Sequence, residues 1–292
     1  MDDSLPSEAR AAVLDWFDAT GRTLPFRASS DPYGILVSEV MAQQTQISRV
    51  AAKWAAFMEA FPTVKVLATA PASDVLRAWR GLGYNRRALN LHRAARAIVA
   101  EHGGRVPSAL TDLERLPGIG PYTARALASL AFGQRVGPVD TNVRRVLRRV
   151  IAADEPMTSV SLQAAADAAV PADRPADWTH ALMDIGATIC RPASPRCGEC
   201  PLRSWCAFAT RGTAVPARPR ARDVKPFAST TRWVRGRIID RLRDAPAGEW
   251  TLLDGPIGSH DPITVDGAIG ALEREGLLER HREDPRLLRL SS

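Results

Sequence analysis

The chain has 292 residues, 45% of them hydrophobic, which is enough to bury a sizeable core and suggests about two domains. It contains no apolar run of about 18 residues and starts with the acidic, polar stretch MDDSLPSEAR, so we expect no membrane span, no signal peptide and a cytoplasmic location. The formal net charge of +7 indicates a polyanionic partner, most simply nucleic acid.

Most of residues 1–206 are predicted to form helices joined by short proline and glycine turns. The first helix covers residues 7–20 and stops at a glycine. Two more lie between Pro32 and Pro62, and an amphipathic helix over 87–102 ends at a Gly-Gly pair. Strand signals are absent from this part of the sequence, so the body of the protein is predicted to be all helical.

Two stretches are rich in arginine and contain no acidic residue, one over 80–96 and one over 144–149. The second falls within a helix that has apolar residues at i, i+3, i+4 and i+7, namely Val143, Val146, Leu147 and Val150. One face of this helix is therefore predicted to join the core. Part of the remaining arginine surface is expected to contact DNA.

Residues 113–127, LERLPGIGPYTARAL, place Gly118 and Gly120 between two helix-like flanks. A helix N-terminus carries unpaired N–H groups and a partial positive charge, so an anion can bind there. Because glycine has no Cβ, the backbone at these positions can approach a DNA phosphate closely. An ordinary turn between two helices, which needs glycine for a positive φ, explains the same pattern equally well.

The only cysteines of the chain are four in one short stretch, Cys190, Cys197, Cys200 and Cys206. Their spacing, C-x6-C-x2-C-x5-C, suits a metal site, whereas disulfides are rare in a cytoplasmic chain. Structural zinc sites usually pair two C-x2-C units and only one is present here, so the spacing favours one [4Fe–4S] cluster. Zinc stays an alternative, which a brown protein that absorbs visible light would exclude.

Residues 207–226 are rich in proline and arginine and show no periodicity, so they are predicted to form a linker. Residues 227–292 begin with a helical segment, continue with a helix and a strand, and end with RLLRLSS, which could close a hairpin. Helix, helix and a two-stranded wing resemble a winged helix. Such a module can bind DNA or only pack, and both readings stay open.

The helix–Leu-Pro-Gly-Ile-Gly–helix motif, the Gly-Pro and Asp140 about twenty residues later, and the cysteines together resemble the helix-hairpin-helix DNA glycosylases of the endonuclease III superfamily. LPFRASSDPYGILVSEVMAQQTQ and GLGYNRRALNLH resemble its MutY adenine glycosylase branch, and the likeness covers about residues 10–206. The resemblance implies a mainly α fold of two helical subdomains with a cysteine cluster loop that binds one [4Fe–4S] cluster. A small winged-helix-like α+β module would follow at the C-terminus.

This fold class divides the chain into five expected parts. They are an N-terminal helix packing with the cluster subdomain (1–28), a six-helix subdomain with the helix-hairpin-helix motif (29–134), the cluster subdomain with the iron–sulfur loop (135–206), the linker (207–226) and the C-terminal module (227–292).

Cleavage of an N-glycosidic bond resembles glycoside hydrolysis, in which two carboxyl groups are the natural tools. Glu39 lies in the apolar stretch ILVSEVMA, whose side chains could remove it from water and raise its pKa. The resemblance implies that Glu39 protonates the flipped adenine at N7 and later helps to activate water. It implies that Asp140 stabilises the oxocarbenium ion or bonds transiently to C1′. A surface carboxylate and a helix N-cap are the simpler readings of these two residues.

Tyr122 stands where related enzymes that also cut the strand carry a lysine, which forms a Schiff base with the sugar. Tyrosine cannot form that bond. The resemblance therefore implies a monofunctional glycosylase with little or no AP-lyase activity, in which Tyr122 lies against the catalytic centre.

The target base must leave the duplex to be reached, at a cost of roughly a few kcal/mol. By resemblance, Gln44 and Tyr84 insert into the base stack, and the residues that contact DNA are Gln43, Gln44, Thr45, Leu82, Tyr84, Gly118, Gly120 and Asn142. The same resemblance places Arg22, Arg27 and His180 near the adenine pocket, although a lone histidine is more often structural.

The resulting hypothesis is a monomeric base-excision repair enzyme, associated with the nucleoid, that removes adenine opposite 8-oxoguanine or guanine in double-stranded DNA. The 66 residues after the linker are too few for the Nudix-like domain with which many MutY enzymes check for 8-oxoguanine. One alternative is a thymine or uracil mismatch glycosylase, against which Glu39 argues because an acid for N7 suits a purine. Another is a non-catalytic iron–sulfur DNA-binding protein, against which the presence of both carboxyl groups argues.

Overall fold

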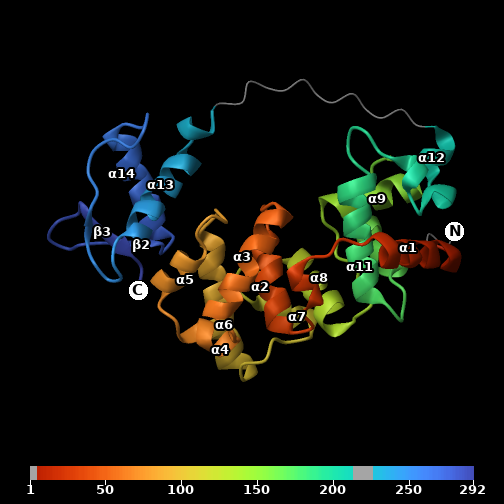
Figure 1. The fold of residues 1–292 in the computed structure, drawn as a ribbon, viewed down its shortest axis with the longest axis horizontal. Helices are drawn as coiled ribbons and strands as arrows, with labels where there is room; N and C mark the ends of the chain where they lie inside the picture. Colours follow the sequence, from red (N-terminus) through yellow and green to blue (C-terminus); the bar gives the residue numbers. More distant parts are fainter. Residues whose placement is uncertain (1–4, 213–225) are drawn as a thin grey trace. The chain divides into compact units, whose positions relative to one another are not determined.

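The computed structural model describes residues 5–212 and 226–292, and its mainly helical fold confirms the predicted class (Figure 1). The chain forms two compact units. The first comprises Met1–Glu39, Val106–Arg115 and Ile119–Pro219, and the second comprises Val40–Arg105, Leu116–Gly118 and Arg220–Ser292. No helix in the described part of the chain is long and apolar enough to cross a membrane.

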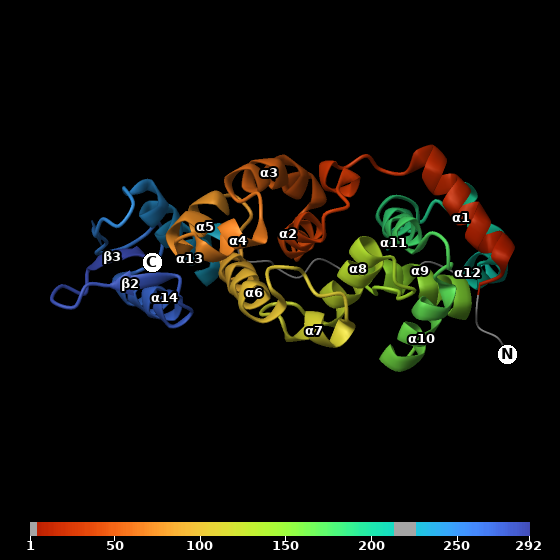
Figure 2. The same cartoon turned by 90° about the horizontal axis from the view of Figure 1, so that it is seen from below.

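The first unit is built on helices at both ends of its sequence. Its helices are α1 (Ser7–Thr20), the 3₁₀ turn η1 (Pro25–Ala28), α7 (Leu110–Arg115), α8 (Pro121–Phe132), α9 (Thr141–Ala152), α10 (Ser159–Ala169) and α11 (Pro175–Asp184). Helix α11 is central, because it contacts α1, α8 and α9 (Figure 2). The apolar face predicted for α9 is confirmed, since Val143, Val146, Leu147 and Val150 are all buried.

The cysteine stretch continues from α11 through short irregular helices. They are the π-helix η2 (Ile185–Ile189), the 3₁₀ turns η3 (Cys197–Glu199) and η4 (Arg203–Trp205), and α12 (Ala207–Arg211). The linker predicted for 207–226 therefore begins with a helix, because the Phe208 side chain is 5% exposed and α12 packs against α9. Residues 213–225 of that linker lie outside the described part of the chain.

Helix α2 (Pro32–Ala42) starts in the first unit and ends in the second, which continues with α3 (Ile47–Ala60), α4 (Val64–Thr69), α5 (Ala72–Ala78) and α6 (Arg86–His102). Both α4 and α5 pack against α6. Residues 29–134 thus form seven α-helices, one more than expected. The reason is local, since the Thr63 side chain caps α4 and Pro71 separates it from α5.

The C-terminal module belongs to the second unit and contains η5 (Phe227–Ser229), α13 (Thr231–Asp244), α14 (Pro262–Arg274) and a small antiparallel sheet. The strands β1 (Thr251–Leu252), β2 (Leu278–Arg280) and β3 (Leu287–Leu290) have the order β1-β3-β2, with Thr251 opposite Leu288 and Leu278 opposite Leu290. The winged-helix-like α+β architecture is confirmed. Strand β1 adds a third strand to the expected two-stranded wing.

Candidate active site

Glu39 lies in helix α2, where every residue from Tyr33 to Met41 is buried. Its carboxyl group is thereby removed from water, and the residue is only 9% exposed. Burial, reinforced by the negative charge of Asp140, raises the pKa of Glu39 to about 7. Glu39 can therefore hold a proton at a pH where an exposed glutamate has lost it, as its apolar flanks predict.

Tyr122 lies in the first turn of α8, and its side chain hydrogen-bonds to that of Glu39. Burial and the two carboxyl groups of Glu39 and Asp140 raise the pKa of Tyr122 well above its usual value. The phenol therefore stays neutral and can donate its proton in a hydrogen bond to Glu39. The structure thus brings together the three side chains that the sequence analysis selected as catalytic.

Asp140 is the N-cap of α9. Its Oδ1 accepts hydrogen bonds from the backbone N–H groups of Asn142 (2.8 Å) and Val143 (2.7 Å), and its Oδ2 accepts one from the Asn142 side chain (3.2 Å). A helix N-terminus favours a negative charge at such a position. The same side chain acts electrostatically on Glu39 and Tyr122. Its role as helix cap therefore also holds the carboxylate beside Glu39 and Tyr122. The reading of Asp140 as an N-cap and its reading as a catalytic group are compatible.

Arg22 and Arg27, which were assigned to the base pocket, are both bound to one buried carboxylate, that of Asp184. Arg27 donates to the two Asp184 oxygens at 2.9 and 2.7 Å, and Arg22 Nε donates at 2.7 Å. Burial alone would raise the pKa of Asp184, but the hydrogen bonds from Arg27 and Arg22 outweigh it and hold the pKa below its usual value. Asp184 thereby positions Arg27, whose charge moderates the raised pKa of Glu39.

His180 lies on α11 one turn before Asp184, and its ring stacks on Phe17 with a centroid distance of 6.4 Å. Burial and the positive charge of Arg27 lower the pKa of His180 to about 3. The imidazole is therefore neutral at physiological pH. A neutral imidazole can both donate and accept a hydrogen bond, which suits a base edge as well as a structural role.

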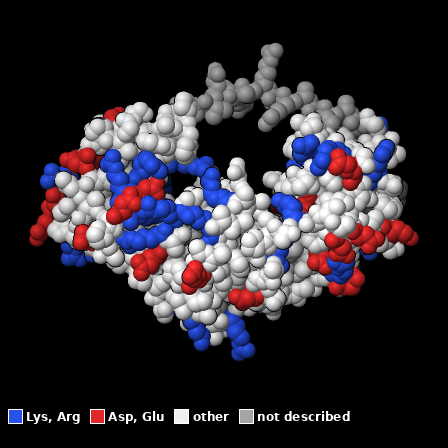
Figure 3. Space-filling view, viewed as in Figure 1, with Lys and Arg blue, Asp and Glu red and all other residues white. Residues whose placement is uncertain are grey.

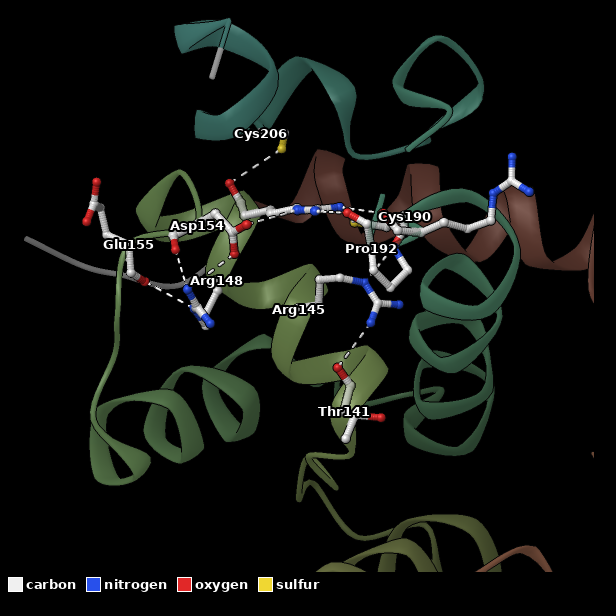
Figure 4. Close-up of polar contacts among 10 residues, drawn as sticks. Thr141, Arg145, Arg148, Asp154, Glu155, Cys190, Pro192 and Cys206 are labelled. Carbon is white, nitrogen blue, oxygen red and sulfur yellow. Dashed lines mark hydrogen bonds and ion pairs between the residues drawn. The ribbon is translucent and has the colours of Figure 1, made fainter. Parts of the chain in front are cut away.

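Arg145 connects the N-terminus of α9 to the start of the cysteine stretch (Figure 4). Its guanidinium donates to the carbonyl oxygens of Cys190 (2.6 Å) and Gly186 (2.7 Å) and to the Asn142 side chain (2.9 Å). Gly186 permits this packing, because a Cβ there would lie 2.6 Å from the Asn142 Cβ. Since Asn142 also binds Asp140, the cysteine stretch helps to position that carboxylate.

The other arginines of α9 are largely used inside the first unit. Arg148 donates to the backbone oxygens of Asp154 and Glu155 (Figure 4). Arg149 is 3% exposed and donates to the Cys190 sulfur at 3.5 Å and to a neighbouring carbonyl oxygen of the cysteine stretch. Arg149 therefore lies inside the first unit, whereas Arg144 is exposed and stays a candidate for the predicted DNA contact.

The two hairpin glycines have different structural reasons. Gly118 has a φ of +79°, and a Cβ there would lie 2.6 Å from the Asn90 Cβ, so the fold itself requires glycine. Gly120, the N-cap of α8, has a φ of −92°, and a Cβ there would have no heavy atom within 4 Å. The fold therefore gives no steric reason for glycine at position 120, and the close approach of a phosphate stays the prediction for this position.

We expect replacement of the two glycines to separate stability from DNA binding. Gly118→Ala should lower the free energy of unfolding by about 1–3 kcal/mol because of the left-handed backbone. Gly120→Ser should leave the unfolding midpoint unchanged, since serine is a good N-cap, but should weaken DNA binding. Thermal unfolding and duplex titration of both variants measure the two effects. Unchanged affinity of the stable Gly120→Ser protein would contradict the phosphate assignment.

Two loops of the second unit, after α2 and between α5 and α6, carry the wedge residues. We use this name for Gln44 and Tyr84, which are expected to insert into the base stack, and for their neighbours Gln43, Thr45 and Leu82. Gln44 and Tyr84 both have positive φ, at 55° and 45°, which is costly for residues other than glycine. Buried Arg87 holds the two loops together. It donates to Thr45 Oγ1 (2.8 Å) and to the Leu82 carbonyl (3.1 Å), and its guanidinium lies 5.6 Å from the Tyr84 ring centroid.

These contacts distinguish the wedge residues from one another. Tyr84 is 39% exposed and Gln44 is exposed, so both are accessible to a base stack. Leu82 is 2% exposed and Thr45 bonds within the loops, so in this structure they support the wedge from inside. Gln43 Nε2 donates to the Gly118 carbonyl at 3.4 Å, which brings the first wedge loop to the hairpin. No pattern in the sequence indicates this role of Arg87.

The four cysteines line one cavity, as their spacing predicts. Its other walls are mostly apolar, with Val146, Val150, Ile185, Ile189 and Phe208 among them. Within the described residues, no three His, Cys, Asp or Glu side chains are grouped closely enough to hold a single metal ion. The thiols are thus distributed around a common apolar space. Four thiols around one space are consistent with an iron–sulfur cluster.

Comparison with known proteins places this site in a family context. Residues 37–170 match the HhH-GPD superfamily of base excision DNA repair proteins. The chain is 42% identical over 271 residues to an adenine DNA glycosylase of Mycolicibacterium smegmatis, and the match covers 92% of each chain. It is 43% identical over 210 residues to the adenine DNA glycosylase of Homo sapiens, covering 68% of this chain and 38% of that protein.

Solved structures agree with the fold. A thermostable thymine-DNA glycosylase is similar with a TM-score of 0.65 and 30% identity, over 69% of this chain and 95% of that chain. An endonuclease III in a non-covalent complex with DNA is similar with a TM-score of 0.60 and 22% identity, over 70% of this chain and 94% of that chain. These similarities confirm the helix-hairpin-helix glycosylase fold that the motifs indicate.

Proposed function

Because this chain belongs to the adenine DNA glycosylase family within the HhH-GPD superfamily of base excision repair proteins, we propose that it removes adenine opposite 8-oxoguanine or guanine in double-stranded DNA. The observation that carries the proposal is the group formed by buried Glu39 with half-buried Tyr122 and Asp140. It offers a proton donor and a carboxylate, which hydrolysis of an N-glycosidic bond requires.

Glu39 is the proposed general acid. Its pKa of about 7 lets it carry a proton near neutral pH and also release it readily, which is the best compromise for proton transfer. Protonation at N7 makes adenine a better leaving group, because the electrons of the glycosidic bond then neutralise a positive charge on the base. After the base has left, the deprotonated Glu39 can accept a proton from the attacking water.

Asp140 is the proposed stabiliser of the sugar. As the base departs, positive charge develops on C1′ and the ring oxygen, and a fixed carboxylate favours that charge without reorganisation. Two backbone N–H groups and Asn142 hold Asp140 in place. Its orientation is therefore set before the substrate arrives.

Tyr122 has the proposed role of orienting the Glu39 carboxyl group rather than attacking the sugar. A phenol with a raised pKa is a poor nucleophile, and it has no amine with which to form a Schiff base. The reaction is therefore proposed to stop at the abasic site, without cleavage of the strand.

The cysteine cavity is proposed to hold one [4Fe–4S] cluster through Cys190, Cys197, Cys200 and Cys206. The supporting observations are the four thiols around one space and its apolar walls. When bound, the cluster supplies covalent cross-links that fix an irregular stretch of chain. Because Arg145 bonds to the Cys190 carbonyl, these cross-links also hold the N-terminus of α9 and hence Asp140.

Single-turnover cleavage of duplexes that contain A:8-oxoG, A:G, T:G, U:G or A:T tests the proposal, with and without alkali after incubation. We expect strand breaks only after alkali, fastest at A:8-oxoG. Breaks without alkali would contradict the assigned role of Tyr122. Release of thymine or uracil would instead assign the protein to the mismatch branch, to which the similar thymine-DNA glycosylase structure belongs by name. Binding without any base release would leave a DNA-binding protein.

A further inference from the structure

The second unit contains a groove that none of the proposed catalytic residues lines. One side is formed by the wedge loops and the start of α6, with Gln44, Tyr84 and Arg86 among its residues. The other side is formed by the C-terminal module, mainly by Phe227 and by arginines of α13. The module therefore shares a surface with the residues predicted to enter the base stack.

Contact across this groove is direct. The Arg232 guanidinium lies 4.2 Å from the centroid of the Tyr84 ring, and its Nη1 donates to the Tyr84 hydroxyl at 2.8 Å. It also lies 5.5 Å from the Phe227 ring centroid. Tyr84 and Phe227 are 39% and 59% exposed. Two accessible aromatic rings that contact one arginine are typical of surfaces that bind nucleic acids.

The charge of the groove is strongly positive. Seven arginines line it, against the two carboxylates of Asp240 and Glu275. Both carboxylates already form ion pairs, Asp240 with Arg237 at 2.5 Å and Glu275 with Arg235 at 2.7 Å. Among the residues that the structure describes, Arg49, Arg86 and Arg232 form no ion pair, and all three are exposed. Figure 3 shows arginine and lysine side chains gathered over the region of α5 and α13.

The wall that α13 provides is firmly attached to the rest of the unit. Buried Arg243 donates to the Leu76 carbonyl at 2.8 Å and to the Asn85 side chain at 2.9 Å. Arg80 pairs with Asp244 at 2.6 Å. Asn85 directly follows Tyr84, so the module is fixed to the wedge loop itself.

We propose that the C-terminal module binds duplex DNA through this groove, and that Arg232 contacts a phosphate next to the wedge. The proposal rests on the proposed function in one respect, because it takes the ligand to be the duplex from which the base is flipped. Two properties of Arg232 suit it to bind a phosphate. Its planar donor group is exposed, and its charge has no carboxylate partner. Its stacking on Tyr84 holds it beside the base stack that the tyrosine would enter.

Two full-length variants of α13 test this inference. Arg232→Ala removes the proposed contact, and Arg241→Ala removes an exposed arginine of the same helix that does not line the groove. The ligand is a duplex with a tetrahydrofuran abasic analogue opposite 8-oxoguanine, titrated at several salt concentrations. We expect Arg232→Ala to weaken binding about fivefold to tenfold and to reduce the salt slope by about one, while Arg241→Ala stays within about twofold of the parent.

Arg232→Lys separates the charge from the planar group. It should restore the salt slope but only part of the affinity, since lysine cannot reproduce the stacking and forked donation of arginine. Equal affinity and salt slope for Arg232→Ala, Arg241→Ala and the parent would overturn the inference while leaving the glycosylase function intact. A parent protein that binds no duplex at all would overturn both.

Discussion

Replacement of Glu39 with glutamine is expected to slow base release by about 10²- to 10⁴-fold, because general acid catalysis contributes that much. Glutamine has nearly the same shape and still accepts the hydrogen bond from Tyr122, so the site should stay assembled. Glu59→Gln, on the exposed surface of α3, removes a carboxyl group elsewhere and should leave the rate unchanged. The measurement is the single-turnover rate with an A:8-oxoG duplex. A rate within about threefold of the parent would remove Glu39 from the mechanism.

The same variant should also change stability, and the sign follows from the pKa. Because the folded pKa of about 7 lies above the unfolded value of 4.5, the unfolded state ionises first as the pH rises. The contribution of Glu39 to stability is therefore full below pH 4.5 and is lost between pH 4.5 and 7. One pKa unit corresponds to about 1.4 kcal/mol. The free energy of unfolding of the parent should therefore fall by about 3 kcal/mol relative to that of Glu39→Gln by pH 8. Denaturant unfolding of both proteins at pH 5 and pH 8 measures this difference.

Replacement of Asp140 with asparagine is expected to slow base release by about 10²- to 10³-fold, as removal of one preorganised electrostatic group typically does. Asparagine is as good an N-cap as aspartate, so the hydrogen bonds to Asn142 and Val143 should persist. The loss should therefore appear in the rate of the chemical step while the unfolding midpoint stays nearly constant. Single-turnover rates and thermal unfolding, measured on the same preparation, report the two quantities.

Asp261→Asn is the matched control for Asp140→Asn. Asp261 caps α14 in the same way, with its Oδ1 accepting from the Thr264 N–H at 2.7 Å, and it plays no part in the proposed site. Its replacement should affect neither the rate nor the stability. If Asp140→Asn behaved like Asp261→Asn, Asp140 would be a helix cap and no more.

Local sequence patterns were sufficient to predict much of the structure of this protein. The apolar spacing of α9, the glycines of the hairpin and the four closely spaced cysteines each concern residues near one another in sequence, and helix periodicity or backbone sterics decides their arrangement. The carboxyl groups of Glu39 and Asp140 are about a hundred residues apart, and their pairing came only from the family resemblance.

Long-range polar contacts could not be predicted. Nothing near Asp184 in the sequence indicates that it binds Arg22 and Arg27, because these two arginines lie far away in the sequence, near the N-terminus. Arg87 and Arg149 belong to the arginine-rich stretches expected at the surface, but both are buried. Carbonyl groups of neighbouring loops accept hydrogen bonds from their terminal guanidinium nitrogens, which offsets part of the cost of burial. An arginine-rich segment alone does not reveal which of its members face water.

Helix α2 and the loop that follows it carry two residues that the proposed reaction uses, Glu39 and Gln44. Glu39 lies in its last turn, and Gln44 follows the helix end by two residues. At 1.5 Å per residue, the acid is about 5 Å along the axis from the end of a helix that is buried and therefore cannot bend freely. If Gln44 inserts into the base stack and Glu39 delivers the proton as proposed, the two groups are close neighbours along one stretch of chain. In kinetic terms, extrusion of the base and its protonation are expected to occur together. A protein whose loop cannot insert is therefore expected to be unable to protonate the base as well.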